Sequence, residues 1–338
     1  MKNFKNLCIV SNDKFYKKKY TNHNDLDSIV EAFDRKYNIQ IIGRNTKNKL
    51  KFLTIKKKIT FLDFFSIKTL KYIKALDKKT KFLFISLTPF NVFVFLFLRF
   101  FFNNFFLYLI SNGFNEYKII FGCLGNFFYY LMLRVVINNV KLIISSKDLN
   151  FKNSFFYLVK PSELTNQWFK NIKNNYVNPK NVRLLYLGRY RKEKGIEDFI
   201  KLISLSNLNF KMKVFGIDYA NSFINSKKVE YFTQITKLKE IIRAYDDCNI
   251  FILPSYTESS PKVIWESLAR LRPVIVFDDI SHVAKDKIGV YVCQRNLDSL
   301  IKTINFIMNN YKSIKENIKK NKFPLKKKFQ QQLINILK

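Results

Sequence analysis

Short apolar runs that alternate with helix-length segments constrain the fold of this 338-residue chain more than any other feature. In the first half these runs are β-rich and apolar throughout, and they lie at residues 7–10, 39–42, 82–87, 105–110 and 141–144. Continuous apolar runs are typical of strands that are buried on both faces of a parallel sheet. Helical patterns at 27–33 and 67–76 fill two of the intervals. The first half is therefore expected to form a doubly wound α/β domain.

The pattern restarts after a polar break at residues 171–180, NIKNNYVNPK, which we interpret as an interdomain linker. Strands are then expected at residues 183–187, 211–215, 250–253 and 274–277. Helices are expected at residues 196–204, 238–246, 263–271 and 297–309. The fold class that follows is α/β, with two Rossmann-like doubly wound domains that face each other across a cleft. The expected boundaries are 1–175 and 181–310, with a basic tail at 311–338.

A basic loop, GRYRKEKG, follows the strand expected at 183–187. Gly188 permits a tight turn at the end of the strand, and Arg189 and Lys194 flank the loop. Ligands bind outside the carboxyl ends of strands in open α/β sheets, so both cations should point towards the cleft. Both side chains suit a diphosphate, because the planar guanidinium of Arg can donate two parallel hydrogen bonds and the ammonium of Lys acts as a point charge. A solvated basic loop would have the same composition, and both interpretations stay open at this point.

A second group of polar residues follows the strand at 250–253, in the segment PSYTESSPKVIWESLARLRPVIV. Pro261 suits the first turn of the next helix, whose unpaired N–H groups would form an anion site. Glu266, eight positions after Glu258, can accept hydrogen bonds from vicinal hydroxyls such as those of a ribose. Glu258 can reach hydroxyls on the other side of a phosphate group. General acid–base catalysis by the two carboxylates, or a capping role for either one, is also compatible with the pattern.

Taken together, the two segments resemble the donor half of family-4-type retaining glycosyltransferases of the GT-B fold. The shared pattern is a GR-x(n)-KG loop, then PS-x-x-E-x7-E, then a Pro-Val strand, and it covers about residues 181–310. The first half resembles the acceptor domain of bacterial members that build surface polysaccharides and lipopolysaccharide, through SLTPFNVF (86–93) and LISNGFNEYK (109–118). The resemblance implies an acceptor domain at 1–175 and a donor domain at 181–310. It also implies that the helical tail at 311–338 packs back on the first domain.

The resemblance also implies residue roles. Arg189 and Lys194 would neutralise the diphosphate, Glu266 would bind the ribose hydroxyls, and Glu258 would bind the hydroxyls of the transferred sugar. The implied catalytic residues are Arg189, Lys194 and Glu258. The implied donor-binding residues are Gly188, Arg189, Lys194, Glu258, Ser259, Lys262, Val263 and Glu266. The acceptor candidates are Asn112, Gly113 and Glu116.

The implied activity is that of a metal-independent, hexosyltransferase-type enzyme. It would move a sugar from a nucleoside-diphosphate sugar to a glycan or lipid-linked acceptor with retention of anomeric configuration. No cofactor and no metal are implied, since no DxD-type pair lies at a strand end; the pairs at 246–247 and 278–279 are expected at the surface. No protein base is evident, so the leaving phosphate itself is expected to act as the base.

Three positions depart from the family pattern. The segment 11–24 has no glycine, whereas many relatives have a Gly-rich loop after the first strand. No histidine lies between residues 24 and 281, so Asn112 and Gly113 would take the place of an acceptor-domain histidine. Ser259 stands where glycine is usual, and His282 is expected to be a loop histidine.

Charge adds a hypothesis about location. The chain has 60 basic and 25 acidic side chains, for a net charge of +35. The excess is +21 over residues 1–180, +6 over 181–310 and +8 over 311–338. A/T-rich codons explain part of the lysine excess, and the scarcity of arginine disfavours specific nucleic-acid recognition. The uneven distribution favours a cytoplasmic protein bound peripherally to the inner, anionic face of the membrane. The oligomeric state stays open.

Two long apolar runs could be mistaken for membrane spans. The run at 92–110 is interrupted by Arg99 and by Asn103-Asn104, so a buried helix followed by a strand is expected. The run at 127–137 is shorter and carries Arg134. Residues 93–106 and 127–133 are instead candidates for contact with a membrane interface. The start of the chain is expected to be a short basic lead and a first strand rather than a signal peptide.

Two other functions remain as alternatives. One is a basic membrane- or nucleic-acid-binding protein with a vestigial donor site. The other is a different GT-B enzyme, such as a sugar-phosphate synthase. The presence of Arg189, Lys194, Glu258 and Glu266 together argues against a vestigial site.

Overall fold

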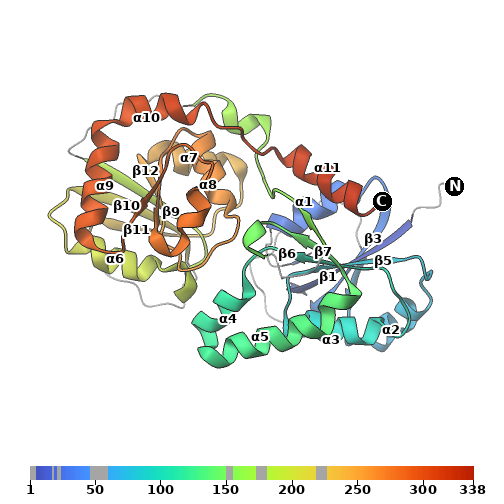
Figure 1. Ribbon diagram of the computed structural model, residues 1–338. Coiled ribbons are helices and arrows are strands. Elements are labelled where there is room, and N and C mark those ends of the chain that lie inside the picture. The colour runs from blue at the N-terminus through green and yellow to red at the C-terminus, as the bar shows by residue number, and fades with distance from the viewer. Residues whose placement is uncertain are drawn as a thin grey trace. The chain divides into compact units, whose positions relative to one another are not determined.

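The computed structural model describes residues 5–16, 19–20, 24–45, 60–149, 155–172, 181–217 and 227–338. The chain forms two compact units (Figure 1). Unit 1 comprises Met1–Pro161 together with Lys326–Lys338, and unit 2 comprises Ser162–Leu325.

Unit 1 is built on a sheet of order β4-β3-β1-β5-β6-β7-β8, with β2 paired to β1. The β1–β2 pairing is antiparallel and the pairings along the rest of the sheet are parallel. The strands are β1 (Lys5–Tyr16), β2 (Lys19–Tyr20), β3 (Tyr37–Asn45), β4 (Thr60–Asp63), β5 (Lys81–Ile85), β6 (Phe105–Leu109), β7 (Lys141–Ile144) and β8 (Phe156–Leu158). The central strands are apolar throughout because each contributes to two cores. In β5, Phe82 and Phe84 face one core, and Leu83 and Ile85 face the other.

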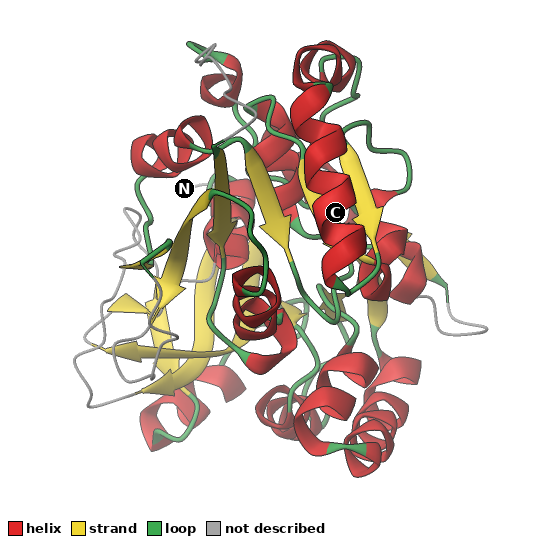
Figure 2. Ribbon diagram, turned by 90° about the vertical axis from the view of Figure 1, so that its left-hand side faces the viewer, coloured by secondary structure: helices red, strands yellow, loops and turns green. Residues whose placement is uncertain are grey.

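Helices cover both faces of this sheet. Figure 2 shows the helices of the chain in red and its strands in yellow. One core includes side chains of α2 (Ile67–Lys74), α3 (Pro89–Leu98) and α5 (Cys123–Val136). The other includes side chains of α1 (Asn24–Phe33) and of the C-terminal helix α11 (Lys326–Ile336). These two helices lie side by side in Figure 1. Helix α4 (Gly113–Phe121) precedes α5, and short 3-10 turns lie at Ile137–Asn139 and Lys147–Leu149.

Unit 2 is built on a parallel sheet of order β11-β10-β9-β12-β13-β14. Its strands are β9 (Val182–Leu187), β10 (Phe210–Ile217), β11 (Val229–Thr233), β12 (Ile250–Leu253), β13 (Val274–Phe277) and β14 (Val290–Cys293). Its helices are α6 (Ile196–Ser204), α7 (Leu238–Asp247), α8 (Lys262–Ala269), α9 (Leu297–Asn309) and α10 (Tyr311–Ile318). Shorter 3-10 helices lie at Asn166–Phe169, Lys192–Lys194 and Asp278–Ala284. Each of these α-helices contributes side chains to one hydrophobic core.

The expected α/β class with two doubly wound parallel sheets is confirmed. The apolar run at 92–110 is a helix followed by a strand, α3 and β6. Among the residues that the structure describes, no helix is both long enough and apolar enough to cross a bilayer. The strands that the pattern misses are mostly edge or outer strands, such as β11 and β14. Polar residues interrupt the sequence of β11, VEYFT, whereas β14, VYVC, is apolar but only partly buried.

The structure divides the chain differently from the expected boundaries at both joins. Residues 162–172 belong to unit 2 rather than to a first domain ending at 175, because Leu164 and Trp168 are buried in the core of unit 2. Residues 311–325 also stay with unit 2, where Tyr311 and Ile318 are buried. Only residues 326–338 of the expected tail belong to unit 1. Of the expected linker at 171–180, residues 173–180 lie outside the described residues.

Candidate active site

The two loops singled out in the sequence follow neighbouring strands of unit 2. The chain runs from β9 to β10 and β11 on one side, then crosses to β12, β13 and β14 on the other. The strand order therefore reverses between β9 and β12, which pair directly, with Phe251 opposite Leu185. Ligands of open α/β sheets bind at such a switch point, outside the carboxyl ends of the strands. The loops after β9 and β12 both lie there.

Backbone contacts join these two loops. The N–H of Tyr256 donates to the Glu193 carbonyl at 3.0 Å. Gly195 has φ of +60°, and a Cβ at this position would lie 2.3 Å from the Pro254 carbonyl oxygen. Glycine is needed here for both reasons, because a side chain would be strained by the backbone and would collide with the second loop. Gly195 lets α6 begin directly beside the loop that carries Glu258.

Lys194 and Glu258 form an ion pair across the two loops. Lys194 Nζ lies 2.7 Å from Glu258 Oε1, and the Ser255 hydroxyl donates to the same oxygen at 2.8 Å. The two charged side chains are 17% and 13% exposed, so the pair is partly withdrawn from water yet accessible to a ligand. His282 also contacts this loop, with Nε2 at 2.9 Å from the Glu258 carbonyl oxygen. The structure thus brings together two residues to which the resemblance assigns separate roles.

Glu266 is buried near the start of α8. Tyr245 Oη lies 3.0 Å from Glu266 Oε2. Burial raises the pKa of Glu266 to about 7, against the opposing effects of the Lys262 charge and the Tyr245 hydrogen bond. Lys262 is the first residue of α8 and pairs with Glu163 at 3.1 Å. Pro261 is the N-cap of this helix rather than a first-turn residue, a difference of one position.

The remaining donor-binding candidates lie in the same two loops or in the first turn of α8. Arg189 is exposed, and its carbonyl accepts a hydrogen bond from the buried Tyr186 hydroxyl at 2.8 Å. A Cβ at Gly188 would lie 2.8 Å from that hydroxyl oxygen. The Val263 carbonyl oxygen lies 3.3 Å from Tyr245 Oη. Ser259 is buried, and its hydroxyl has no hydrogen-bond partner among the described residues.

The acceptor candidates lie in unit 1, after β6. Asn112 is the N-cap of α4, and its side chain accepts a hydrogen bond from the N–H of Asn115 at 3.4 Å. Gly113 is buried against Tyr129, whose ring would lie 2.0 Å from a Cβ at this position. Glu116 lies in the first turn of α4. Helix capping is sufficient to explain Asn112, and close packing against Tyr129 is sufficient to explain Gly113. The acceptor role of Asn112, Gly113 and Glu116 stays a prediction.

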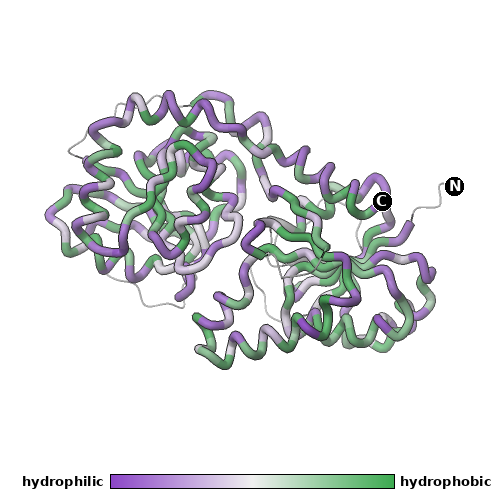
Figure 3. The backbone as a smooth tube through the Cα atoms, viewed as in Figure 1, coloured by the Kyte–Doolittle hydropathy of each residue, from purple (hydrophilic) through white to green (hydrophobic). Residues whose placement is uncertain are grey.

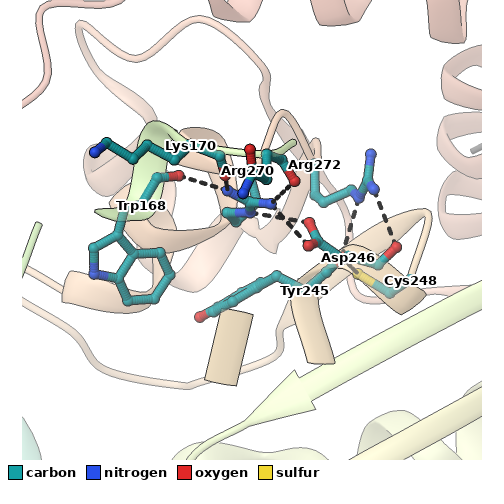
Figure 4. Close-up of polar contacts among 8 residues, drawn as sticks. Trp168, Lys170, Tyr245, Asp246, Cys248, Arg270 and Arg272 are labelled. Carbon is teal, nitrogen blue, oxygen red and sulfur yellow. Dashed lines mark hydrogen bonds and ion pairs between the residues drawn. The ribbon is translucent and has the colours of Figure 1, made fainter. Parts of the chain in front are cut away.

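Sequence reasoning missed a buried ionic cluster behind the site (Figure 4). The expectation that Asp246 lies at the surface is wrong, since this residue is 4% exposed. Its carboxylate accepts two hydrogen bonds from Arg270, at 2.9 and 2.7 Å. Arg270 also donates to the carbonyls of Trp168, Lys170 and Asn171, and Arg272 donates to the carbonyls of Tyr245 and Asp246. The feature of the sequence that could have revealed this cluster is RLRP, in which two arginines come just before a fully buried strand.

The candidate site lies within a segment that matches a known protein family. Residues 169–323 match the family described as Glycosyl transferases group 1. A Staphylococcus aureus relative, the capsular polysaccharide biosynthesis glycosyltransferase CapM, is 26% identical; the match covers 56% of this chain and 51% of the relative. The N,N'-diacetylbacillosaminyl-diphospho-undecaprenol alpha-1,3-N-acetylgalactosaminyltransferase of Campylobacter jejuni is also 26% identical, over 53% of this chain and 48% of the relative. The chain thus matches about half the length of these curated relatives.

Solved structures with the same fold cover nearly the whole chain. Sucrose-phosphate synthase from Thermosynechococcus elongatus has a TM-score of 0.69 at 14% identity, over 98% of this chain and 95% of that one. Anabaena HepE in complex with UDP-glucose has a TM-score of 0.68 at 10% identity, over 98% and 99%. WaaG, a glycosyltransferase involved in lipopolysaccharide biosynthesis, has a TM-score of 0.62 at 11% identity, over 96% and 98%. The GT-B fold is confirmed, and residues 169–323 match the group 1 glycosyltransferase family.

Proposed function

We propose that this chain, which carries a group 1 glycosyltransferase domain at residues 169–323, transfers a sugar from a nucleoside-diphosphate sugar to a glycan or lipid-linked acceptor of a cell-surface polysaccharide. One observation carries the proposal. Lys194, Glu258 and Glu266 come from the two loops and the helix at the switch point of the unit 2 sheet, within the matched segment. The candidate site thus combines the ammonium group of Lys194, the partly exposed carboxylate of Glu258 and the buried carboxylate of Glu266.

The charges account for the main chemical requirement of the reaction. Cleavage of the sugar–phosphate bond leaves negative charge on the departing diphosphate, and preorganised cations and N–H groups stabilise that charge. Arg189, Lys194 and the first N–H groups of α8 would supply this stabilisation without a metal ion. Glu258 would bind hydroxyls of the transferred sugar, and Glu266 those of the ribose. We propose that the reaction proceeds with retention and that the leaving phosphate takes the acceptor's proton.

The test is a ligand panel followed by product analysis. Thermal unfolding of the full chain with UDP-, GDP-, ADP- and CMP-sugars should show a raised midpoint with one nucleotide class, because a ligand that binds only the folded state stabilises it. NMR of the product should then show the donor's anomeric configuration, and EDTA should leave turnover unchanged. No shift with any nucleotide would contradict the assignment. Transfer to a soluble sugar phosphate rather than to a lipid-linked glycan would instead favour a sugar-phosphate synthase.

A second part of the proposal concerns location, and α5 supports it. Tyr129, Met132, Leu133 and Val136 of this helix are buried. Its opposite face is also apolar but exposed, and it consists of Leu124, Phe127, Phe128, Leu131 and Val135, which we call the outer stripe of α5. Figure 3 shows α5 and α3 as largely hydrophobic. A helix that is apolar on all sides is normally buried in protein or membrane.

Basic residues accompany the outer stripe of α5. Lys118 and Arg134 are exposed on α4 and α5, and Ile120 and Phe121 extend the apolar surface onto the end of α4. Apolar side chains flanked by cations suit an interface with anionic lipid. We propose that this surface holds the protein on the inner face of the cytoplasmic membrane, where a lipid-linked acceptor would present its sugar.

A further inference from the structure

Tyr245 lies behind Glu266 and has no contact with solvent. It belongs to the last turn of α7 and is 0% exposed. Its Oη lies 3.0 Å from Glu266 Oε2 and 3.3 Å from the Val263 carbonyl oxygen. A tyrosine has one hydroxyl hydrogen to donate, and the nearer carboxylate oxygen is the stronger acceptor when it is ionised. The hydroxyl therefore holds one oxygen of Glu266 and leaves Oε1 for another donor.

The buried ionic cluster fixes the position of Tyr245. Arg272 Nε donates to the Tyr245 carbonyl at 3.0 Å, and the next residue, Asp246, is clamped by Arg270 (Figure 4). The Tyr245 ring packs against Trp168 and Phe251, with centroid distances of 5.9 and 5.5 Å. The phenol thus has little freedom to move, and its hydroxyl is a fixed donor at the floor of the site.

We propose, on the basis of the function proposed above, that Tyr245 is a positioning residue: it orients the Glu266 carboxylate so that Oε1 receives the ribose hydroxyls of the nucleotide. The inference assigns a role to a residue outside the two loops that form the site. It also explains why a phenol is buried beside a buried carboxylate, since a phenylalanine would leave that carboxylate without its donor.

The charge state of Glu266 gives this role a separate signature. The charged and titratable groups that face Glu266 are Lys262, Tyr245 and Glu163; the first two favour the ionised form and Glu163 opposes it. Loss of the Tyr245 hydroxyl removes a hydrogen bond to the ionised form, so Glu266 would ionise at a higher pH. Any affinity that depends on ionised Glu266 should shift in the same direction.

The experiment compares UDP with 2′-deoxy-UDP, or GDP or ADP with its deoxy form if the ligand panel selects that nucleotide. The wild-type protein should prefer the ribonucleotide about tenfold at pH 8, as expected for one hydrogen bond to a charged group. This preference should fall as the pH drops through about 7, where Glu266 protonates. Protonation of the diphosphate affects the dissociation constants of both nucleotides in the same way. It therefore cancels in their ratio, which is the measured preference.

Tyr245→Phe should reduce the preference at pH 8 to about two- to threefold and move its midpoint to higher pH. The control is Tyr311→Phe, which removes another buried tyrosine hydroxyl from the same core, one that donates to the Asn249 carbonyl at 2.8 Å. This control should keep the wild-type preference and midpoint. In a Glu266→Gln background, Tyr245→Phe should have no further effect on the preference, because the two substitutions break the same interaction.

Other outcomes would overturn the inference in distinguishable ways. Unchanged preference and midpoint in Tyr245→Phe would make Tyr245 a core residue only. Nucleotide binding by the wild-type protein without ribose preference would remove the role of Glu266 on which the inference rests. Absence of nucleotide binding by the wild-type protein would overturn the proposed function itself. A preference ratio is measured on folded molecules, so partial unfolding of a variant does not imitate any of these results.

Discussion

Lys194 is paired with Glu258 in the structure, and this determines what its removal would do. Glu258 lies 2.7 Å away, and both side chains are largely withdrawn from water. Truncating one partner leaves the other charge poorly compensated, so the effects of substitutions at the two positions should not be additive. The pair also holds the two loops together beside the α8 N-terminus, where the proposed diphosphate would bind.

Lys194→Ala should lower turnover by roughly 10²-fold, because it removes a preorganised charge from the leaving group. Lys192→Ala is the matched control, since Lys192 is exposed in the same turn; it should be close to wild type. Arg189→Ala and Arg191→Ala form a second pair of the same design. Steady-state kinetics with the donor identified by the ligand panel provides the measurement. Near-normal turnover in both Lys194→Ala and Arg189→Ala would contradict the assigned site.

Glu266→Gln should weaken nucleotide binding and stabilise the fold at the same time. The folded-state pKa of Glu266 is raised to about 7, so its contribution to stability is fully present at pH 4 and is lost as the pH rises through 7. At pH 8 the free energy of unfolding should rise by up to about 3 kcal/mol in the variant, and nucleotide affinity should fall by about 1–2 kcal/mol. Urea unfolding at pH 5 and 8 tests the first effect, because the gain should disappear at the lower pH. Equal nucleotide affinity would make Glu266 a structural residue.

At the scale of elements, the Asp246–Arg270 pair joins three parts of unit 2. Asp246 belongs to α7, Arg270 follows α8, and Arg270 also binds the carbonyls of the segment that enters the unit at 168–171. A buried pair contributes little net stability compared with an apolar substitute, but breaking one side of it leaves an uncompensated charge. The cluster therefore fixes the register of α7 and α8 and, through them, Tyr245 and Glu266.

Asp246→Asn should lower the free energy of unfolding of unit 2 by about 3 kcal/mol or more, because it leaves the Arg270 guanidinium buried without a counter-charge. Glu316→Gln is the control, since it removes a surface carboxylate that pairs with Lys319 at 2.8 Å; it should change the free energy of unfolding far less than Asp246→Asn does. Urea titrations of the full-length variants give both values. If both variants lost equally little unfolding free energy, the backbone carbonyls alone would be sufficient to hold Arg270.

At the scale of the whole molecule, the basic excess and the exposed apolar surface occur in the same unit. Unit 1 has 32 basic and 9 acidic side chains, a net charge of +23, and it contains the outer stripe of α5, where Leu124 is 78% exposed. Unit 2 has 28 basic and 16 acidic side chains, a net charge of +12. Codon usage alone would raise lysine in both. The contrast is the reason for the proposed division of roles, in which unit 1 would contact the membrane and unit 2 would bind the donor.

The full-length protein should sediment with vesicles that contain phosphatidylglycerol and much less with neutral phosphatidylcholine vesicles, and salt should weaken the binding. Replacing Phe127 and Phe128 with serine should reduce binding to the anionic vesicles. Leu205→Ser is the control, because Leu205 is 75% exposed but lies in unit 2. Equal binding to both vesicle types would indicate apolar insertion without charge attraction. Absence of binding would favour a soluble acceptor.

The sequence by itself determined the elements whose physical signal is local. Five segments, at 141–144, 196–204, 250–253, 274–277 and 297–309, match the observed strands and helices residue for residue, because continuous burial or a helical period is a property of the segment's own sequence. The sequence also predicted that Lys194, Glu258 and Glu266 follow strands, and the structure places them after β9 and β12, which are neighbours in the sheet.

Only the tertiary structure decided which distant residues meet. The ion pair of Lys194 with Glu258, the bond of Tyr245 to Glu266 and the burial of Asp246 all depend on strand order and helix packing. The unit boundary at 161–162 and the return of α11 to unit 1 depend on which core buries Trp168 and Phe329. A sequence pattern specifies that a side chain is buried or charged, but its partner is fixed by long-range contacts that bring together residues far apart in the chain.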